Sequence, residues 1–230
     1  GKIRICLDPK ELNKYVKIPK YRLPTMDDII SNMKKVRMFT VMDAKDGFLQ
    51  VRLEKESAKL TAFHTPFGRY MWKRMPFGIC SAPEEFQKQL QNILGDLNGI
   101  KIIADDILII GQGESLQEAT KDHDSNLIQF LNRCRERNLK LNKDKIRFKQ
   151  QSVKFNGHIL TTEGLLPDPE KIEAIRNMPR PRDKKEVKRF LGMITYLSKF
   201  LPSLSNVSQP LREISNVKSE FIWANHHQEA

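Results

Sequence analysis

Apolar residues along the first 160 positions recur at two different spacings. Alternation of apolar and polar residues is typical of strands, and apolar residues at every third or fourth position are typical of helices. Alternation predicts strands at residues 2–7 and 48–53, and apolar runs predict strands at 38–42, 100–103 and 107–110. Further strands are expected at 146–148 and 153–160, together with a hairpin that joins 61–65 to 69–74. The helical spacing predicts helices at residues 27–34, 83–97 and 116–134. This mixture indicates an α+β fold, in which helices back an antiparallel sheet.

The pattern changes after residue 162, where strand-like alternation ends. Residues 165–169 are expected to form a linker, because a glycine and two prolines lie in it or beside it. Beyond it only helices are expected, at 169–177, 183–201 and 203–214. We therefore expect an α+β domain at residues 1–162, followed by a small helical domain.

The chain carries 40 Lys and Arg residues against 28 Asp and Glu residues, a formal net charge of +12. Excess positive charge favours a polyanionic partner, of which nucleic acid is the commonest, and a generic basic surface is the alternative. Basic residues concentrate in segments 1–37, 138–154 and 171–199. The acids that lie apart from these segments are Asp43, Asp46, Asp105 and Asp106. Basic walls around an acidic centre suit the cleft of a polymerase.

The three cysteines, Cys6, Cys80 and Cys134, are odd in number and far apart. Their spacing predicts neither a disulfide framework nor a zinc site, and a reducing, intracellular setting is the default. No apolar run approaches the roughly 20 residues that a membrane helix needs. Because the chain begins at Gly1 without a signal-peptide pattern, we expect it to be cut from a longer chain.

Three carboxylates lie at the ends of predicted strands. Asp43 directly follows strand 38–42, and the pair Asp105-Asp106 lies between two apolar arms. Burying carboxylates without partners is costly, and close like charges repel each other unless a cation intervenes. Two Mg²⁺ ions about 4 Å apart would resolve both problems, and such a pair can activate a 3′-hydroxyl and stabilise a leaving pyrophosphate. The alternative is that the Asp pair is simply an exposed hairpin turn.

Three segments carry these acids and their neighbours in order: Phe39-Thr-Val-Met-Asp43-Ala-Lys-Asp-Gly-Phe48-Leu-Gln50, Met75-Pro-Phe-Gly78-Ile-Cys-Ser-Ala-Pro83-Glu-Glu-Phe86-Gln87 and Ala104-Asp-Asp106-Ile-Leu108. They resemble motifs A, B and C of reverse transcriptases. Arg4-Ile-Cys-Leu-Asp8-Pro-Lys-Glu-Leu12-Asn13-Lys14 resembles the end of the fingers of these enzymes. Phe190-Leu-Gly192-Met-Ile-Thr-Tyr196 resembles the thumb helix of gypsy-like LTR retrotransposons, the Metaviridae type. The resemblance covers nearly the whole chain, and the motifs together are highly specific.

The resemblance implies a right-hand polymerase with partial fingers and the palm at 1–162, a helical thumb at 163–218, and the truncated start of a connection or RNase H region at 219–230. The implied function is that of an RNA-directed DNA polymerase, part of a retrotransposon pol polyprotein, which extends a primer on an RNA or DNA template by two-metal nucleotidyl transfer. Two Mg²⁺ ions, with Mn²⁺ as a substitute, are the implied cofactors. The implied partners are an RNA template, a DNA primer, the RNA–DNA hybrid and deoxynucleoside triphosphates, with no membrane, in a cytoplasmic particle or the nucleus.

The resemblance also assigns roles residue by residue. Asp43, Asp105 and Asp106 would hold the metal ions, and Lys145 fits a motif D lysine that protonates pyrophosphate, with Lys143 as the nearby alternative. Residues implied to bind the nucleotide or the template are Arg4, Ala44, Phe48, Phe77, Gly78 and Gln87, among which Phe48 is the steric gate against a 2′-hydroxyl. Residues implied for the primer grip are Phe155, Asn156, Gly157 and His158. Residues implied for duplex contact are Lys188, Gly192 and Tyr196, on a helix whose basic side also carries Lys184, Lys185 and Arg189.

The chain departs from the family pattern at three positions. Ile103 stands where an aromatic residue is usual, Ala104 replaces a bulkier residue, and Asn156 is polar where the primer grip is usually apolar. None of these changes removes an implied metal ligand.

Three other functions fit the sequence less well. A viral RNA-directed RNA polymerase is disfavoured by Phe48, because such enzymes need room for the 2′-hydroxyl. A domesticated, catalytically weak remnant that only binds nucleic acid is disfavoured by the intact acids. A Ca²⁺-binding structural domain would need an EF-hand-like run of ligands, which the sequence lacks.

Overall fold

The protein is described by a computed structural model that covers residues 5–31, 33–217 and 219–229. Its contacts divide the chain into two compact units. Unit 1 comprises the described residues up to Asn156 together with Leu160–Gly164, and unit 2 comprises Gly157–Ile159 together with the described residues from Leu165 onward. The chain therefore passes from one unit to the other three times within a ten-residue stretch.

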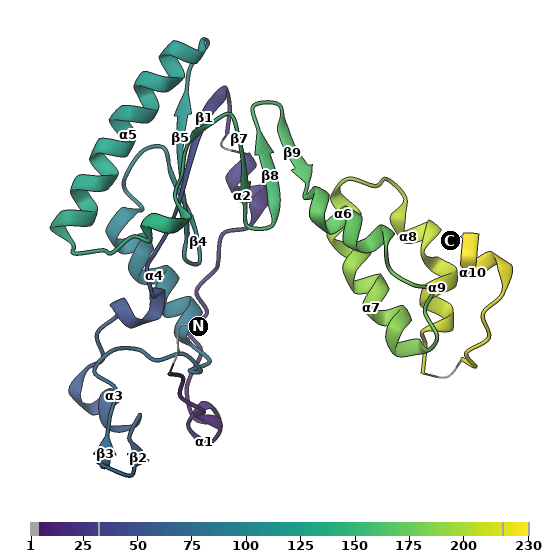
Figure 1. Cartoon of the computed structure of the whole chain (residues 1–230), viewed down its shortest axis with the longest axis horizontal. Helices are drawn as coiled ribbons and strands as arrows, with labels where there is room; N and C mark the ends of the chain where they lie inside the picture. The colour runs from purple at the N-terminus through teal and green to yellow at the C-terminus, as the bar shows by residue number, and fades with distance from the viewer. Residues whose placement is uncertain (1–4, 32, 218, 230) are drawn as a thin grey trace. The chain divides into compact units, whose positions relative to one another are not determined.

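Unit 1 is built on a four-stranded antiparallel sheet with the strand order β4-β5-β1-β6 (Figure 1). Its strands are β1 (Val36–Asp43), β4 (Ile100–Ile103), β5 (Asp106–Gln112) and β6 (Arg147–Gln150). The two central strands are almost continuously buried, because both of their faces are covered. The predicted strands at 38–42, 100–103 and 107–110 are confirmed.

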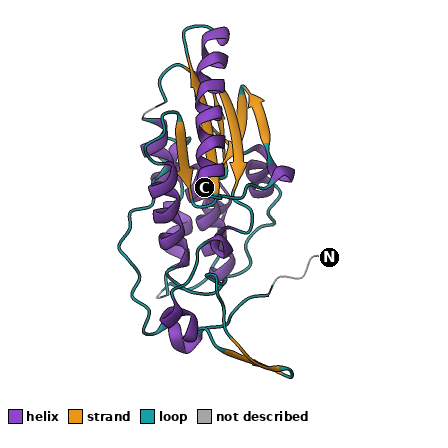
Figure 2. Cartoon of the chain, turned by 90° about the vertical axis from the view of Figure 1, so that its left-hand side faces the viewer, coloured by secondary structure: helices purple, strands orange, loops and turns teal. Residues whose placement is uncertain are grey.

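One face of this sheet is covered by the helices α4 (Ala82–Leu94) and α5 (Leu116–Glu136), which contact the strands and each other. Figure 2 shows helices running across the strands in this part of the chain. Ser115 and Glu118 form a capping box that begins α5, and a proline in the first turn begins α4. The buried side chains that join these helices to the sheet include Met42, Phe86, Leu90, Ile107, Ile109 and Phe130. Both predicted helices are confirmed, although Leu97 lies beyond the end of α4.

The remaining elements of unit 1 are short. They are α1 (Lys10–Asn13), α2 (Met26–Ile30), a 3₁₀ turn at Gly47–Gln50, α3 (Lys55–Lys59), the hairpin of β2 (Phe63–Thr65) and β3 (Gly68–Tyr70), and a 3₁₀ turn at Lys143–Lys145. Helix α2 starts at a capping box formed by Thr25 and Asp28, as its sequence position predicts, but it is shorter than the expected 27–34. The predicted hairpin around Pro66-Phe67-Gly68 is confirmed.

A second sheet consists of β7 (Ser152–Phe155), β8 (His158–Thr161) and β9 (Gly164–Pro167) in that order. Asn156 and Gly157 connect the first two strands, and both have positive φ angles of 43° and 74°. An Asn-Gly pair with two positive φ angles is the preferred two-residue hairpin turn. The single strand predicted at 153–160 is therefore wrong, and this turn explains why residue 156 is polar, because asparagine tolerates the left-handed conformation.

Unit 2 is otherwise helical. Its elements are α6 (Pro169–Arg176), α7 (Lys184–Thr195), a 3₁₀ turn at Tyr196–Lys199, α8 (Leu204–Val207), α9 (Gln209–Ile214) and α10 (Asn225–Glu229). Asp168 caps α6 and Asp183 caps α7. The core residues are Val187, Leu211 and Ile214, against which Phe190, Leu191, Phe221 and Trp223 pack. Residues from the final twelve positions therefore complete the core of this unit.

Five further expectations were wrong in detail. The described part of segment 2–7 has no regular structure, and segment 48–53 begins as the 3₁₀ turn rather than as a strand. Segment 165–169 is not a linker, because β9 pairs with β8 there. The helix expected at 203–214 is two helices, since Pro210 lacks the N–H that would continue α8. The helix expected at 183–201 ends at Thr195 and continues as a 3₁₀ turn.

The fold is α+β, with antiparallel sheets backed by helices, as predicted. Among the described helices, none combines the length and the apolar character that crossing a membrane requires.

Candidate active site

The sheet of unit 1 brings the three predicted carboxylates to one end. Asp43 ends β1 and Asp106 begins β5, and the two residues are directly opposite each other in the antiparallel register. Ala104 and Asp105 form the turn between β4 and β5, which we call, together with Asp106, the acidic turn. The N–H of Ala44 donates to the carbonyl of Asp105 at 3.0 Å. The register of two strands thus sets the separation of the carboxylates.

Lys145 pairs with Asp43. Its Nζ lies 2.7 Å from Oδ2 of Asp43, whose side chain is only 10% exposed, and this hydrogen bond is the main reason why the pKa of Lys145 is raised. Burial raises the pKa of Asp106, and the negative charges of Asp105 and Asp43 raise it further. The three acids therefore form a centre with more negative charge than the neighbouring lysine compensates.

The donor set fits a hard divalent cation, because carboxylate oxygens are what Mg²⁺ prefers. Within residues 5–31, 33–217 and 219–229, no group of three or more His, Cys, Asp or Glu side chains is arranged so that it could hold a metal ion. Relief of the repulsion at Asp106 is a second reason why a cation suits this place.

A cavity of about 320 Å³ opens beside the acids. Its lining residues are Asp43, Ala44, Lys45, Asp46, Gly47, Phe48, Phe77, Asp105, Asn142, Asp144 and Lys145. The ring of Phe48 is fixed by neighbours, with its centroid 5.3 Å from that of Phe77 and 5.7 Å from that of Phe86. The structure therefore brings together Asp43, Asp105, Ala44, Phe48, Phe77 and Lys145 around one space.

Gly78 lies against the N-terminal segment. Its φ is +110°, and a Cβ there would lie 2.1 Å from the carbonyl oxygen of Leu7, so only glycine fits. Asn13 supports the same loop, since its Nδ2 donates to the carbonyl of Gly78 and its Oδ1 accepts from the N–H of Cys80. Gly78 thus has a structural reason for its identity in addition to the predicted contact with a substrate. Arg4 lies outside the described residues.

Gln87 does not face the cavity. Its side chain is fully buried, and its amide bonds the backbone at Ile102 and at Ala104. The predicted contact between Gln87 and a template is therefore not what the structure describes, because helical spacing alone did not reveal which way this side chain points.

Gln50 supports this site, although the sequence did not predict such a role. Its Nε2 donates to the carbonyls of Lys45 and Lys140, and its Oε1 accepts from the N–H of Lys140. It therefore ties the loop after Asp43 to the segment that leads to Lys145. Its place inside the motif A segment is the one signal that could have singled it out.

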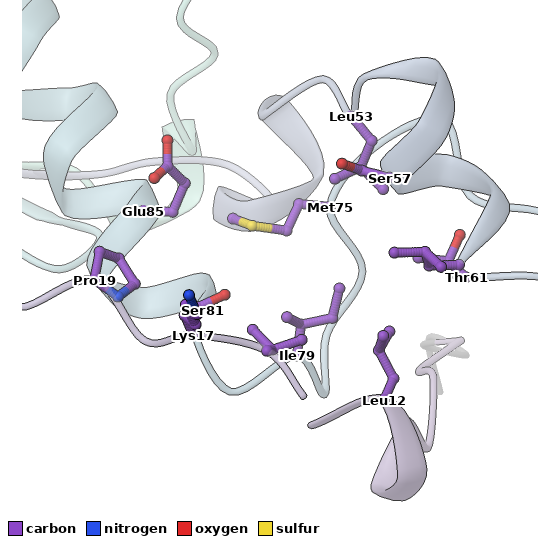
Figure 3. A pocket seen from close by; sticks show the side chains of 12 residues that line it. Leu12, Lys17, Pro19, Leu53, Ser57, Thr61, Met75, Ile79, Ser81 and Glu85 are labelled. Atoms are coloured by element: carbon purple, nitrogen blue, oxygen red, sulfur yellow. The ribbon is translucent and has the colours of Figure 1, made fainter. Parts of the chain in front are cut away.

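A larger cavity, of about 480 Å³, lies elsewhere in unit 1. Figure 3 shows its lining. It combines Leu12, Lys17 and Pro19 with Ser57 of α3 and its neighbours Leu53 and Thr61, with Met75 and Ile79, and with Ser81 and Glu85 near the start of α4. None of the described site residues lines it, and it is mainly apolar.

The predicted primer grip is divided by the Asn156-Gly157 turn. Phe155 is buried in unit 1, whereas Gly157 and His158 belong to unit 2. Within unit 2, the hydroxyl of Tyr196 donates to the carbonyl of Gly157 and accepts from the N–H of Asp168, both at 2.8 Å. The centroid of the Tyr196 ring lies 4.9 Å from that of His158 and 4.0 Å from Nζ of Lys171. Tyr196 therefore anchors this turn, a role that the sequence did not predict.

The other two thumb positions are exposed. Lys188 and Gly192 are one helical turn apart on α7, and no heavy atom would lie within 4 Å of a Cβ at Gly192. Lys184 differs from the other basic residues of this helix, because its Nζ donates to the carbonyls of Val217 and Ser219 and so holds the C-terminal segment. Lys184 is therefore not part of an open basic face.

Comparison with known proteins agrees with this geometry. A family model described as "Reverse transcriptase (RNA-dependent DNA polymerase)" matches residues 1–160. The chain is 36% identical over 233 residues to the Retrovirus-related Pol polyprotein from transposon 297 of Drosophila melanogaster, and the match covers 97% of this chain and 21% of that protein. It is 32% identical over 225 residues to the Transposon Tf2-3 polyprotein of Schizosaccharomyces pombe, where the match covers 97% of this chain and 16% of that protein. The chain thus spans about a fifth of the length of these relatives.

Solved structures show the same fold. A foamy viral protease-reverse transcriptase in complex with double-stranded DNA matches with a TM-score of 0.88 and 25% identity, over 99% of this chain and 40% of that chain. A foamy viral protease-reverse transcriptase in complex with an RNA/DNA hybrid matches with a TM-score of 0.82 and 24% identity, over 96% of this chain and 30% of that chain. From these matches and from the acids at the end of the sheet, the chain belongs to the reverse transcriptase (RNA-dependent DNA polymerase) family, and its relatives are Pol polyproteins of LTR retrotransposons.

Proposed function

We propose that this chain is the polymerase core of a retrotransposon reverse transcriptase, which extends a DNA primer on an RNA or DNA template by nucleotidyl transfer. The observation that carries the proposal is the direct pairing of Asp43 with Asp106 across two strands, beside Asp105 and an open cavity. The proposed parts are fingers and palm at 1–162, a thumb at 163–218, and the start of a further region at 219–230. The proposed setting is intracellular, in a cytoplasmic particle or the nucleus.

Asp43, Asp105 and Asp106 are the residues that would hold two Mg²⁺ ions, with Mn²⁺ as a substitute, and the carbonyl of Ala44 would assist. Bound there, the two ions would lower the pKa of the primer 3′-hydroxyl and stabilise negative charge on the leaving pyrophosphate. The chain's own task is positioning, because phosphoryl transfer depends mainly on alignment and charge compensation. The paired strands support this role, since they hold the acids without a flexible loop.

Lys145 is the proposed proton donor to the leaving pyrophosphate. Its ion pair with Asp43 keeps the ammonium at the edge of the cavity, and the hydrogen bond to Asp43 raises the pKa of Lys145. An exposed fraction of 60% for its side chain leaves it able to turn toward a substrate. Lys143 is the alternative donor, because it lies in the same 3₁₀ turn.

Phe48 is the proposed steric gate, and Phe77 and Gly78 form the adjoining wall of the nucleotide site. The contacts of Phe48 with Phe77 and Phe86 restrict the movement of its ring. A ring that cannot move away imposes a clash on a 2′-hydroxyl, whereas an adaptable apolar pocket rejects an added hydroxyl only weakly. Deoxynucleoside triphosphates are therefore the proposed substrates.

Template and primer are the proposed macromolecular partners. The net charge of +12 supports binding to a polyanion, and the exposed positions Lys188 and Gly192 on α7 support contact with a duplex backbone. Phe155, Asn156, Gly157 and His158 are proposed to hold the primer terminus, with the positive-φ turn as their scaffold.

The test is primer extension on poly-rA/oligo-dT by the 230-residue chain, with Mg²⁺, with Mn²⁺ and with a chelator. We expect dTTP incorporation that requires the divalent ion. Binding of the primer–template without any incorporation under all metal conditions would contradict the proposal and would favour a remnant that only binds nucleic acid.

A further inference from the structure

Gln87 connects helix α4 to the acidic turn through both ends of its side-chain amide. Its Nε2 donates to the carbonyl of Ile102 at 3.2 Å, and its Oε1 accepts from the N–H of Ala104 at 2.7 Å. These two backbone groups lie on either side of Ile103, which pairs with Asp106 in the sheet. The side chain is fully buried, so this contact does not compete with water.

The acidic turn has a reason to need such support. Ala104 has a φ of +54°, in the left-handed region that residues with a Cβ adopt only rarely. A strained residue of this kind persists only where its surroundings hold it. Oε1 of Gln87 accepts the hydrogen bond that the N–H of this strained residue donates.

We propose that Gln87 is a positioning residue, which holds the acidic turn from one side while Ala44 of the β1 end holds it from the other. The N–H of Ala44 bonds the carbonyl of Asp105, and the strand register places Asp43 opposite Asp106. Gln87 thereby helps to hold Asp105 and Asp106 at the separation from Asp43 that the strand register sets, an inference that rests on the proposed function of these acids.

An amide is the side chain that this arrangement requires. Gln both donates and accepts, whereas ionised Glu cannot donate and Met has a similar length but makes neither bond. Gln87→Met would therefore remove both contacts at nearly constant volume and leave the N–H of Ala104 unpaired.

The chain contains a matched control. Asn126 is also a buried amide, and its Nδ2 donates at 3.0 Å to the carbonyl of Ile110, near the opposite end of β5. Asn126→Leu would remove a buried amide of α5 that bonds the same β4–β5 hairpin, without touching the acidic turn. A purely structural role for Gln87 predicts that the two variants lose activity alike.

The experiment measures primer extension as a function of Mg²⁺ and dTTP concentration, together with the thermal midpoint of each variant of the 230-residue chain. For Gln87→Met we expect a kcat lower by roughly 30-fold to 100-fold, a several-fold higher Mg²⁺ concentration at half-maximal rate, and primer–template affinity within about twofold of the parent. For Asn126→Leu we expect a comparable loss of thermal midpoint with kcat within about threefold of the parent. Equal losses of kcat in the two variants, or a Gln87→Met variant as active as the parent, would overturn the proposal.

A second measurement needs neither activity nor a folded variant. In the unmodified chain, amide hydrogen exchange at Ala104 should be slow, comparable to that in the central strand β5. Exchange as fast as in the exposed turn between β2 and β3 would refute the proposal that Gln87 holds the N–H of Ala104. If the unmodified chain fails to extend primers but the amide of Ala104 exchanges slowly, the proposed function is wrong, whereas the positioning of the acidic turn by Gln87 is supported.

Discussion

The acidic turn of unit 1 and the open face of α7 in unit 2 present functional residues in opposite ways. Around the acids, contacts from three elements meet: the register of β1 and β5, the N–H of Ala44, and the amide of Gln87. On α7, Lys188 and Gly192 are exposed, and no heavy atom would lie within 4 Å of a Cβ at Gly192. The acidic turn is held in place by several neighbouring elements, whereas the α7 positions are held only by their own helix.

This difference indicates what each region can do. Chemistry at a phosphate requires alignment to a fraction of an ångström, which buried backbone contacts provide. Contact with a nucleic-acid backbone tolerates movement, because each charge contributes a similar, sequence-independent amount. A single substitution among the acids should therefore abolish nucleotide incorporation, whereas several substitutions on α7 together are needed to weaken duplex binding.

The largest effect is expected from Asp43→Asn or Asp105→Asn. Either change removes a charge that is proposed to bind metal, so nucleotide incorporation should fall by about 10³-fold or more. Duplex affinity should change little, because that affinity depends on the basic surfaces. Primer extension and a binding titration together check this, with Glu163→Gln, in an exposed turn, as the charge-removal control. Activity within about tenfold of the parent would contradict the role of the acids.

A smaller effect is expected from Phe48→Val. Removing the ring should raise the preference for rCTP relative to dCTP on the order of a hundredfold, while the need for a divalent ion stays unchanged. Values of kcat/KM for both nucleotides decide the matter. An equal fall for both sugars would indicate lost packing against Phe77 and Phe86 rather than a gate.

The α7 face can be tested by replacing Lys185, Lys188 and Arg189 with Ala together. Each lost phosphate contact should make the dependence of log affinity on log salt less steep by about 0.9. Lys184→Ala is the instructive comparison, because its Nζ holds the backbone at Val217 and Ser219. We expect that variant to lower thermal stability and to leave the salt dependence almost unchanged. An unaltered slope in the triple variant would mean that this face does not touch the duplex.

A modest effect is expected from Tyr196→Phe. The change keeps the ring and removes two hydrogen bonds, to Gly157 and from Asp168, each worth about 1 kcal/mol. The thermal midpoint should fall by several degrees, and Tyr70→Phe, on the exposed hairpin, should have no such effect. Equal thermal midpoints for Tyr196→Phe and Tyr70→Phe would show that the hydrogen bonds of Tyr196 do not stabilise the protein.

The smallest effect concerns pH. His123 is fully buried, and its Nε2 lies 2.8 Å from the hydroxyl of Thr40 while Nδ1 faces Asp124 at 3.3 Å. Burial lowers the pKa of His123, with the opposing influence of Asp124 as the lesser factor. The folded state thus prefers the neutral ring, so its contribution to stability is complete above the unfolded value of about 6.5 and is lost as pH falls through the folded pKa.

The thermal midpoint should therefore fall between pH 7 and pH 5 by more in the parent than in His123→Gln, in which this group no longer titrates. Thermal melts of both proteins at several pH values provide the measurement. Parallel curves would show that His123 is not linked to folding in this range.

Much of this molecule could be predicted from local sequence patterns. The apolar arms around Asp105-Asp106, the strand before Asp43 and the spacing of α5 report burial within a few residues, and these elements lie where the patterns placed them. The motifs also identified the family, because their order along the chain is itself a property of the sequence. The roles of the individual site residues stay predictions until they are tested.

What local patterns missed depends on partners that are distant along the chain. The segment after Gly47 alternates like a strand, yet it forms a 3₁₀ turn, and its Gln50 is bonded to Lys140, ninety positions away. Segment 164–167 became a strand because β8 lies beside it. Gln87 was expected to meet a template and instead bonds Ala104.

The sequence by itself therefore determined where most of the main strands and helices lie, where the acids lie on their strands, and to which family the chain belongs. Only the tertiary structure decided which side chains form hydrogen bonds with the backbone, as Gln87, Lys184 and Tyr196 do, and which remain exposed. The physical reason is that periodicity encodes the burial of a residue, whereas a hydrogen-bond partner is set by how distant segments meet.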